Sequence, residues 1–222
     1  MVQGGRRLRI KICCISSTDE ARLAVECGAD ALGLVSHMPS GPGIIDEALI
    51  AEIATLVPPP IGTFLLTSQQ DADAIIAQQR VCRVNTLQIC DSLKASAYTR
   101  LRSAMPGVAL VQVIHVRGES AIAEALGVAP SVDAMLLDSG NPEAAVRELG
   151  GTGRVHDWEI SRKIVEAAAV PVFLAGGLNA KNVGGAVTRV SPFGVDLCSG
   201  VRTGGKLDAE KLKAFVAAAL GA

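Results

Sequence analysis

Short apolar runs alternate with amphipathic stretches along this chain of 222 residues, and no other feature of the sequence limits the fold as strongly. The apolar runs have the composition of strands that are buried on both faces, and the stretches between them show helical periodicity. We expect strands at residues 8–13, 31–35, 61–66, 84–89, 109–114, 134–137, 172–174 and 194–197. Eight strands, each followed by a helix, predict an α/β chain folded as one (β/α)8 TIM barrel domain over residues 1–222, not an open doubly wound sheet.

The helices are expected at residues 19–27, 46–56, 71–79, 94–105, 119–126, 159–168, 182–190 and 208–220. The segment Ser17-Thr18-Asp19-Glu20 has the short polar side chains that cap the N-terminus of the first helix. Two connections differ from the others. Residues 38–43 are rich in proline and glycine and predict a loop over the barrel mouth, and residues 139–153 predict a second loop, in which residues 142–149 favour a short helix.

The near balance of positive and negative side chains argues against several kinds of partner. Lys and Arg number 21 and Asp and Glu number 22, so neither nucleic acid nor an acidic membrane surface is expected to bind. No apolar run is long enough to span a bilayer, and the N-terminus, with Arg6, Arg7 and Arg9, lacks the apolar stretch of a signal peptide, which predicts a cytoplasmic location. The six cysteines include no Cys-x-x-Cys pair, so we expect reduced thiols.

Three of the expected strand ends are rich in small residues. The loop after the sixth strand ends in Gly150-Gly151-Thr152-Gly153, the seventh strand leads into Gly176-Gly177, and the eighth leads into Ser199-Gly200. Glycines allow successive backbone N–H groups to approach an anion without side chains in the way. One such cluster is more often an ordinary flexible loop, but three in series are typical of a TIM barrel of the phosphate-binding type.

Two reactive side chains fall at expected strand ends. Cys13 ends the first strand and Asp138 ends the sixth, so both are expected at the same mouth of a barrel. A thiolate can abstract a proton, and a carboxylic acid in a dry pocket can donate one. The alternatives are a small buried apolar residue for Cys13 and a helix cap or structural hydrogen bond for Asp138. The spacing alone does not decide between these roles.

Seven motifs occur in a fixed order along the chain. They are Lys11-Ile12-Cys13, Glu26-Cys27-Gly28-Ala29-Asp30-Ala31-Leu32-Gly33, Leu136-Leu137-Asp138, Gly150-Gly151-Thr152-Gly153, Asp157-Trp158, Leu174-Ala175-Gly176-Gly177-Leu178-Asn179 and Asp196-Leu197-Cys198-Ser199-Gly200-Val201. No single motif is decisive, but in this order they resemble the phosphoribosylanthranilate isomerase family along essentially the whole chain.

The resemblance implies a chemistry and a set of site residues. The family carries out a cofactor-free Amadori rearrangement in tryptophan biosynthesis, an aldose–ketose isomerisation of a phosphorylated small molecule. Carried over to this chain, Cys13 would be the general base and Asp138 the general acid. The phosphate would rest on backbone N–H groups of Gly153, Gly176, Gly177, Ser199 and Gly200. Members of the family occur as monomers and as homodimers, and both states stay open for this chain.

The chain also departs from the family pattern. Cys14 replaces a glycine that usually follows the catalytic cysteine, and residues 41–45 lack the arginine that helps to hold the anthranilate carboxylate. The histidine expected after the fourth strand is absent from Gln88-Ile89-Cys90-Asp91. We therefore consider Gln88, Asp91, His37 and Arg117 as candidate pocket residues, with Arg117 as a replacement for the missing cation. The histidines have no acid beside them at ligand spacing, so no metal is expected.

Two other functions are compatible with these departures. The chain could be an enzyme of the same superfamily acting on a different phosphorylated substrate, because loops at the barrel mouth set specificity. It could also be a non-catalytic barrel that binds a phosphorylated ligand. Turnover that depends on Cys13 and Asp138 would separate an enzyme from a binding protein.

Overall fold

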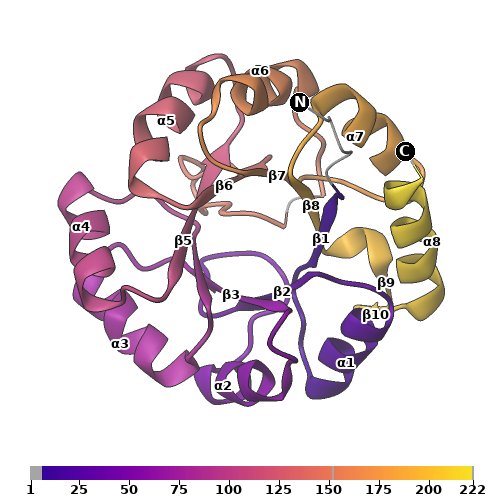
Figure 1. Ribbon diagram of the computed structural model, residues 1–222, viewed down its shortest axis with the longest axis horizontal. Helices are drawn as coiled ribbons and strands as arrows, with labels where there is room; N and C mark the ends of the chain where they lie inside the picture. The colour runs from indigo at the N-terminus through magenta and orange to yellow at the C-terminus, as the bar shows by residue number, and fades with distance from the viewer. Residues whose placement is uncertain (1–6, 152, 222) are drawn as a thin grey trace.

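The strands close into a parallel barrel in the order β1 to β8, and helices surround it (Figure 1). The structure is a computed structural model that describes residues 7–151 and 153–221. The barrel strands are β1 Arg9–Ile12, β2 Ala31–Val35, β3 Gly62–Thr67, β4 Thr86–Ile89, β5 Ala109–His115, β6 Ala134–Asp138, β7 Val172–Leu174 and β8 Gly194–Leu197. Strand β1 pairs with β8, with Lys11 opposite Asp196, and this pairing closes the ring. The predicted (β/α)8 barrel is confirmed.

The helices follow the strands as the sequence predicts. They are α1 Thr18–Glu26, α2 Glu47–Leu56, α3 Ala72–Cys82, α4 Ala95–Ala104, α5 Ser120–Val128, α6 Trp158–Ala167, α7 Val183–Val190 and α8 Ala209–Leu220, with short 3-10 helices η1 Ala129–Ser131 and η2 Ser199–Val201 and a small hairpin of β9 Arg202–Thr203 and β10 Lys206–Leu207. Ser17 is the N-cap of α1, as expected, and its hydroxyl accepts a hydrogen bond from the backbone N–H of Glu20 at 3.1 Å. Such a cap satisfies one of the free N–H groups of the first turn.

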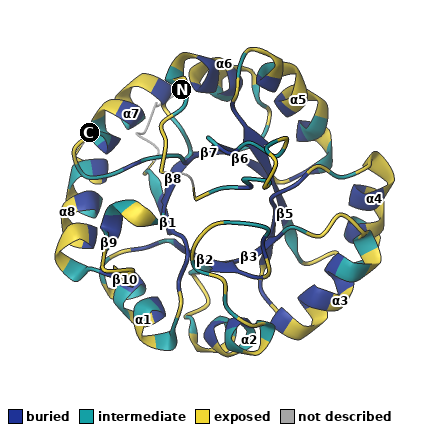
Figure 2. Cartoon of the chain, turned by 180° about the vertical axis from the view of Figure 1, so that it is seen from behind, coloured by how far each residue is buried: buried dark blue, intermediate teal, exposed yellow. Residues whose placement is uncertain are grey.

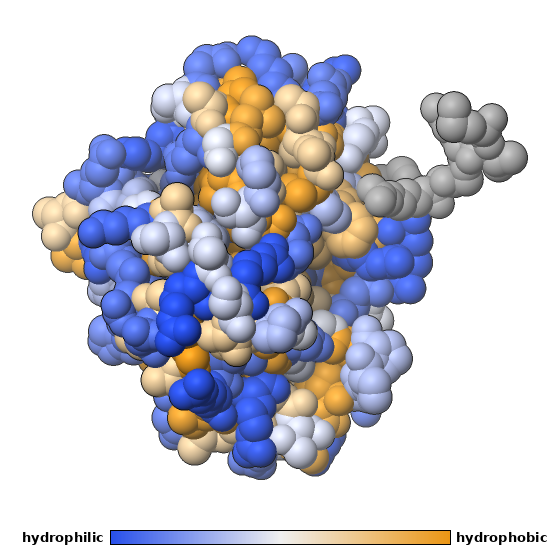
Figure 3. All heavy atoms as spheres, turned by 60° about the vertical axis from the view of Figure 1, so that its left-hand side comes forward, coloured by the Kyte–Doolittle hydropathy of each residue, from blue (hydrophilic) through white to orange (hydrophobic). Residues whose placement is uncertain are grey.

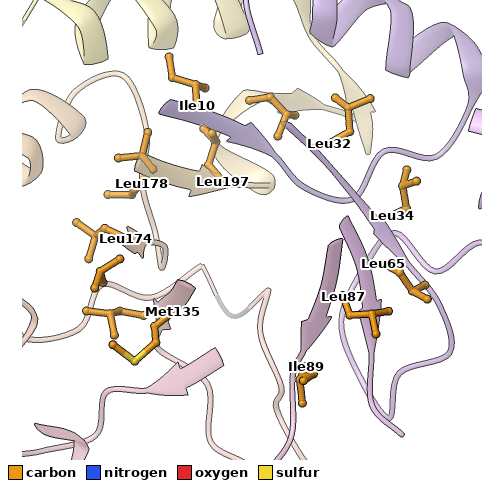
Figure 4. Close-up of a cluster of buried hydrophobic side chains, with 14 of the residues drawn as sticks. Ile10, Leu32, Leu34, Leu65, Leu87, Ile89, Met135, Leu174, Leu178 and Leu197 are labelled. Atoms are coloured by element: carbon orange, nitrogen blue, oxygen red, sulfur yellow. The ribbon is translucent and has the colours of Figure 1, made fainter. Parts of the chain in front are cut away.

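Side chains alternate between two buried layers along each strand. Ile10 and Ile12 of β1 belong to the large apolar layer between the strands and the helices, and Figure 4 shows further members of this layer, such as Leu65. Cys13 belongs to a second cluster with Phe64 and other side chains of the barrel interior. Figure 2 shows the barrel strands mostly buried and the helices exposed on their outer faces. The period of two thus sends alternate residues of the strands into the barrel interior, where those at the C-terminal ends of the strands face the site.

Two loops lie inside the ring of helices in Figure 1, over the barrel. One joins β2 to α2 and the other joins β6 to α6. The prediction of a short helix at residues 142–149 is wrong. This part of the second loop consists of turns closed by a bridge between Asn141 and Glu148. The N–H of Glu148 donates to the carbonyl of Asn141 at 3.0 Å, which folds the loop back on itself and takes up backbone groups that a helix would have used. Arg6 and Thr152 lie outside the described residues.

The outer surface is mostly hydrophilic on the face shown in Figure 3, with hydrophobic residues in patches between the polar ones. Large apolar side chains that are exposed, such as Leu56, Val81 and Leu126, come from different helices. Scattered exposed apolar residues are normal for a globular surface. Over residues 7–151 and 153–221, none of the helices has the length and apolar character needed to cross a membrane.

Candidate active site

Cys13 follows β1 directly and opens the site. Its N–H donates to the carbonyl of Leu197 in β8 at 2.8 Å, which continues the β1–β8 ladder by one residue, and its side chain is buried. On the neighbouring strand, a Cβ at Gly33 would lie 2.9 Å from the Cys13 sulfur and 3.0 Å from the Lys11 ammonium nitrogen. Glycine at position 33 therefore makes the room in which the thiol and the ammonium group lie close to each other.

An ion pair lies beneath the thiol in the barrel interior. The ammonium nitrogen of Lys11 is 3.0 Å from a carboxylate oxygen of Asp196, and it also lies 5.2 Å from the centre of the Phe64 ring. Burial is the largest single influence and works to lower the pKa of Lys11, but the charge and hydrogen bond of Asp196, together with the nearby Cys13 and Cys14, outweigh it, so the pKa is raised above the usual value. Lys11 therefore brings a buried positive charge to the site. Sequence reasoning missed this role, although charged residues within apolar strands were a visible signal.

Asp138 is the last residue of β6 and is also buried. The backbone N–H of Ser139 donates to one of its carboxylate oxygens at 2.7 Å. Burial raises the pKa of Asp138, and the Ser139 hydrogen bond only partly opposes this effect. A Cβ at Gly150 would lie 2.9 Å from the other carboxylate oxygen, so the loop after β6 passes directly over the acid. The arrangement favours a proton on Asp138, as a general acid requires.

The structure brings Cys13 and Asp138 into one pocket at the barrel mouth. Both line it, as do Gln88 and the carboxylate-bearing Asp196. One part of the wall is apolar and comprises Val35, Met38, Leu66 and Leu149, while another is formed by Gly153, Gly176, Gly177 and Ser199. The pocket therefore offers two proton-transfer groups between an apolar side and a glycine-rich side.

The glycine-rich side requires glycine for steric reasons. Gly153, Gly176 and Gly177 have φ values of 68°, 84° and 62°, in the left-handed region that side chains disfavour. A Cβ at Gly177 would lie 2.9 Å from the carbonyl oxygen of Gly153, so the loops after β6 and β7 are in close contact. Gly200 does not line the pocket; a Cβ there would lie 2.2 Å from the carbonyl oxygen of Leu178, which indicates a packing role.

Two of the candidate pocket residues are placed elsewhere. His37 is exposed and does not line the pocket, because Ser36 takes the buried position after β2 and accepts a hydrogen bond from Gln78 at 2.7 Å. Arg117 is also outside the pocket; its guanidinium donates to both carboxylate oxygens of Glu143 at 2.7 and 3.0 Å. Neither residue is a pocket-wall residue in this structure.

Asp91 does not line the pocket either, but it adjoins it. Its side chain is 7% exposed, and it forms an ion pair with Arg147 of the loop after β6. The neighbouring residues Gln88 and Cys90 do line the pocket. Arg147, which sequence reasoning did not consider, thus neutralises the acid that follows β4.

Cys14 and Arg202 support the backbone around Cys13. Cys14 has a φ of 62° and lies between the sulfurs of Cys13 and Cys198, and hydrogen bonds with these sulfurs raise its pKa, so this thiol stays protonated. Arg202 binds both carboxylate oxygens of Glu20 at 2.9 and 3.0 Å and donates to the carbonyl of Cys14. Among the described residues, no three His, Cys, Asp or Glu side chains are grouped as metal ligands.

Comparison with known sequences gives consistent matches over nearly the whole chain. A family model described as N-(5'-phosphoribosyl)anthranilate (PRA) isomerase matches residues 10–218. An N-(5'-phosphoribosyl)anthranilate isomerase of Haloferax volcanii is 38% identical over 215 residues, which are 95% of this chain and 92% of the relative. N-(5'-phosphoribosyl)anthranilate isomerase 2 of Methanosarcina mazei is 37% identical over 211 residues, covering 94% and 92%.

Solved structures give the same match. Phosphoribosyl anthranilate isomerase from Thermotoga maritima superimposes with a TM-score of 0.80 at 28% identity and covers 97% of this chain and 100% of its own. A phosphoribosyl anthranilate isomerase in complex with reduced 1-(o-carboxyphenylamino)-1-deoxyribulose 5-phosphate gives a TM-score of 0.80 at 25% identity, with the same coverage. The structural similarity therefore extends over nearly the whole chain.

Proposed function

The chain belongs to the N-(5'-phosphoribosyl)anthranilate isomerase family, and from this we propose that it converts phosphoribosylanthranilate to the corresponding aminoketose phosphate in tryptophan biosynthesis. The expected family is confirmed, and with it an isomerase of the aldose–ketose type. The roles of individual residues are the part that we propose. They rest on the positions of Cys13 and Asp138 in one pocket.

Asp138 is proposed as the general acid. It donates its proton to the ring oxygen of the ribose, the bond between this oxygen and C1 breaks, and the lone pair of the amine nitrogen forms a carbon–nitrogen double bond. The raised pKa of Asp138, caused mainly by burial, supports this role, because the proton must be present before it can be donated. The N–H of Ser139 holds the carboxyl group in one orientation.

Cys13 is proposed as the general base. The thiolate removes the proton from C2, and the electrons of that C–H bond move toward the positive nitrogen to give an enolamine. The enolamine becomes the ketone when C1 takes up a proton and the hydroxyl on C2 loses one. The ammonium group of Lys11 and the thiol of Cys13 both lie within about 3 Å of where a Cβ at Gly33 would be. Lys11 therefore brings positive charge to this part of the site. Positive charge stabilises the negative charge of a thiolate nearby.

The glycine-rich side is proposed to hold the phosphate. Backbone N–H groups of Gly153, Gly176, Gly177 and Ser199 are the candidate donors, and Gly200 contributes through packing against the loop after β7. Binding energy from a phosphate remote from the reacting carbon orients the substrate between the acid and the base. The observation that carries the proposal is that Cys13 and Asp138 share one buried pocket beside this cup.

Three further expectations complete the proposal. No cofactor is needed, because every step is a proton transfer. The six free cysteines agree with a cytoplasmic location, where thiols stay reduced. A monomer and a homodimer both fit, since one of the similar structures is of monomers generated from a dimeric enzyme of Thermotoga maritima.

The test is turnover of freshly generated phosphoribosylanthranilate, followed by its loss of fluorescence. We expect Cys13→Ala and Asp138→Asn each to lower kcat by at least about a hundred-fold, the usual range for general acid–base groups. Cys27→Ala, which removes a thiol next to α1, is the control and should keep wild-type activity. Turnover that survives in Cys13→Ala would refute the assignment of the base, and an inactive wild type that still binds ribose phosphates would indicate a different substrate.

A further inference from the structure

A substrate of the proposed kind carries a second anion besides its phosphate, namely the carboxylate on its aromatic ring. We propose that Arg147 binds this carboxylate and that Asp91 is the positioning residue that holds the Arg147 guanidinium at the pocket rim. The inference rests on the proposed function and assigns the aromatic end of the substrate to one side of the pocket. The two residues are 56 positions apart in the sequence and come from the loops after β6 and β4.

The closed barrel decides which side of the pocket the ring must occupy. The glycine-rich cup is built by the loops after β6, β7 and β8, and β4 lies across the ring from β8. A substrate whose phosphate lies in this cup, and whose sugar lies between Cys13 and Asp138, extends its aromatic ring toward the loops after β2 and β4. That side of the pocket is apolar, with Val35, Met38 and Leu66, as an aromatic ring requires.

The backbone of Arg147 is fixed at this side of the mouth. Its carbonyl accepts a hydrogen bond from the hydroxyl of Ser40 at 2.7 Å, which joins the loop after β6 to the loop after β2. Ser40 lines the pocket, and so does Leu149, two residues beyond Arg147. Arg147 itself does not line the pocket, but the segment that carries it forms part of the pocket wall.

Asp91 holds the guanidinium group by one edge. One carboxylate oxygen of Asp91 accepts from the N–H of Ser92 at 2.8 Å, and the other forms the ion pair with Nη1 of Arg147. The backbone carbonyl of Asp91 accepts from the Gln112 side chain at 3.1 Å, so the acid is anchored on three sides. Its side chain is 7% exposed, whereas that of Arg147 is 42% exposed. A guanidinium has five N–H donors, so a substrate carboxylate can bind to the accessible edge.

The other cations near the mouth are occupied by structural partners. In the parts of the chain that the structure describes, Arg117 is bound by both oxygens of Glu143, Arg202 by both oxygens of Glu20, and Lys11 by Asp196 inside the barrel. Arg154 contacts Glu148 and belongs to the segment next to the phosphate cup. Arg147 is thus the arginine whose carboxylate partner is fixed at the apolar side of the pocket.

The experiment compares two product analogues by calorimetry, the reduced 1-(o-carboxyphenylamino)-1-deoxyribulose 5-phosphate and the same compound without the ring carboxylate. We expect the wild type to bind the carboxylated analogue about ten- to a hundred-fold more tightly, the range for a hydrogen-bonded charged pair. Arg147→Met should abolish this preference while leaving the affinity for the second analogue unchanged, and Arg147→Lys should restore part of it. Asp91→Asn should reduce the preference by less than Arg147→Met.

Arg100→Met is the matched control. Arg100 of α4 pairs with Asp73 of α3, so this variant should keep the wild-type preference. A preference that persists in Arg147→Met, or an equal loss for both analogues, would overturn the inference. Turnover is measured separately. A wild type that shows the preference but does not isomerise phosphoribosylanthranilate would contradict the proposed function and leave the role of Arg147 supported.

Discussion

Lys11 and Asp196 lie opposite each other on β1 and β8, and their charged groups are 3.0 Å apart inside the barrel. Both side chains are almost completely buried, so removing one partner leaves an uncompensated charge. We predict that Lys11→Met lowers the free energy of unfolding by about 3–5 kcal/mol, measured by urea denaturation. The double variant Lys11→Met/Asp196→Asn should recover part of this loss, and equal stabilities of wild type and Lys11→Met would refute the prediction.

Replacing the buried Asp138 with a neutral residue should stabilise the folded state. Burial raises its pKa in the folded state above the unfolded value. Between these two pKa values the folded state holds a proton that the unfolded state releases, so this residue's contribution to stability falls as pH rises through the window. Asparagine cannot ionise, so we predict that Asp138→Asn raises the free energy of unfolding by about 1 kcal/mol at neutral pH, because it removes a buried group that is costly to ionise. Denaturation at acid and at neutral pH should show the gain at neutral pH alone.

His156 should make the fold sensitive to acid. Its ring nitrogen Nε2 lies 2.7 Å from the Ser161 hydroxyl, and burial lowers the pKa of the ring to about 4. A depressed histidine pKa contributes stability that is complete above the unfolded value and is lost as pH falls toward the folded value. From about pH 7.5 to about pH 5, the wild type should lose about 2 kcal/mol more than His156→Gln. Parallel losses in the two proteins would contradict this assignment.

Gly43 and Cys14 should be energetically coupled. A Cβ at Gly43 would lie 2.4 Å from the Cβ of Cys14, and Gly43 has a φ of 81°. Gly43→Ala should therefore cost about 3 kcal/mol from the clash and the backbone strain. Cys14→Gly removes the nearest clashing atom, but the Cα of residue 14 would still lie 2.8 Å from the new Cβ. The double variant should therefore relieve only part of the loss and show a coupling energy of about 1 kcal/mol in a double-mutant cycle. Additive losses would mean that the loop moves away instead.

The elements of the barrel could be predicted because their signal is local. The bounds of β2, β7 and β8 match the expected ranges at both ends, since each is a short apolar run between strong turn signals. The loops could not be predicted in the same way. Residues 142–149 have helical composition, but Asn141 closes them into turns through its backbone carbonyl. A contact of this kind depends on the path of the loop and not on its periodicity.

In the candidate site too, some residues could be predicted from local signals and others could not. Cys13, Asp138 and most of the glycine-rich positions were expected from strand ends, because parallel strands in a barrel bring those ends together. The orientations of His37 and Arg117 depend on one-residue differences after a strand, which the sequence does not specify. The ion pair of Asp91 with Arg147 joins two loops that are distant in the sequence, so only the assembled barrel brings them into contact.

The contact between Cys14 and Gly43 also limits how this sequence can change over evolutionary time. A Cβ at position 43 would clash with both the Cβ and the Cα of Cys14, and the φ of Gly43 is positive, so the present backbone admits only glycine there, in the segment that lacks the family's arginine. The two departures from the family pattern at these positions are therefore sterically linked. Loss of the Cys14 side chain would remove the closest contact but not the contact with the Cα, so a side chain at position 43 also requires the backbone of the loop to move. A change at position 43 is thus accessible only together with a change in the path of the loop.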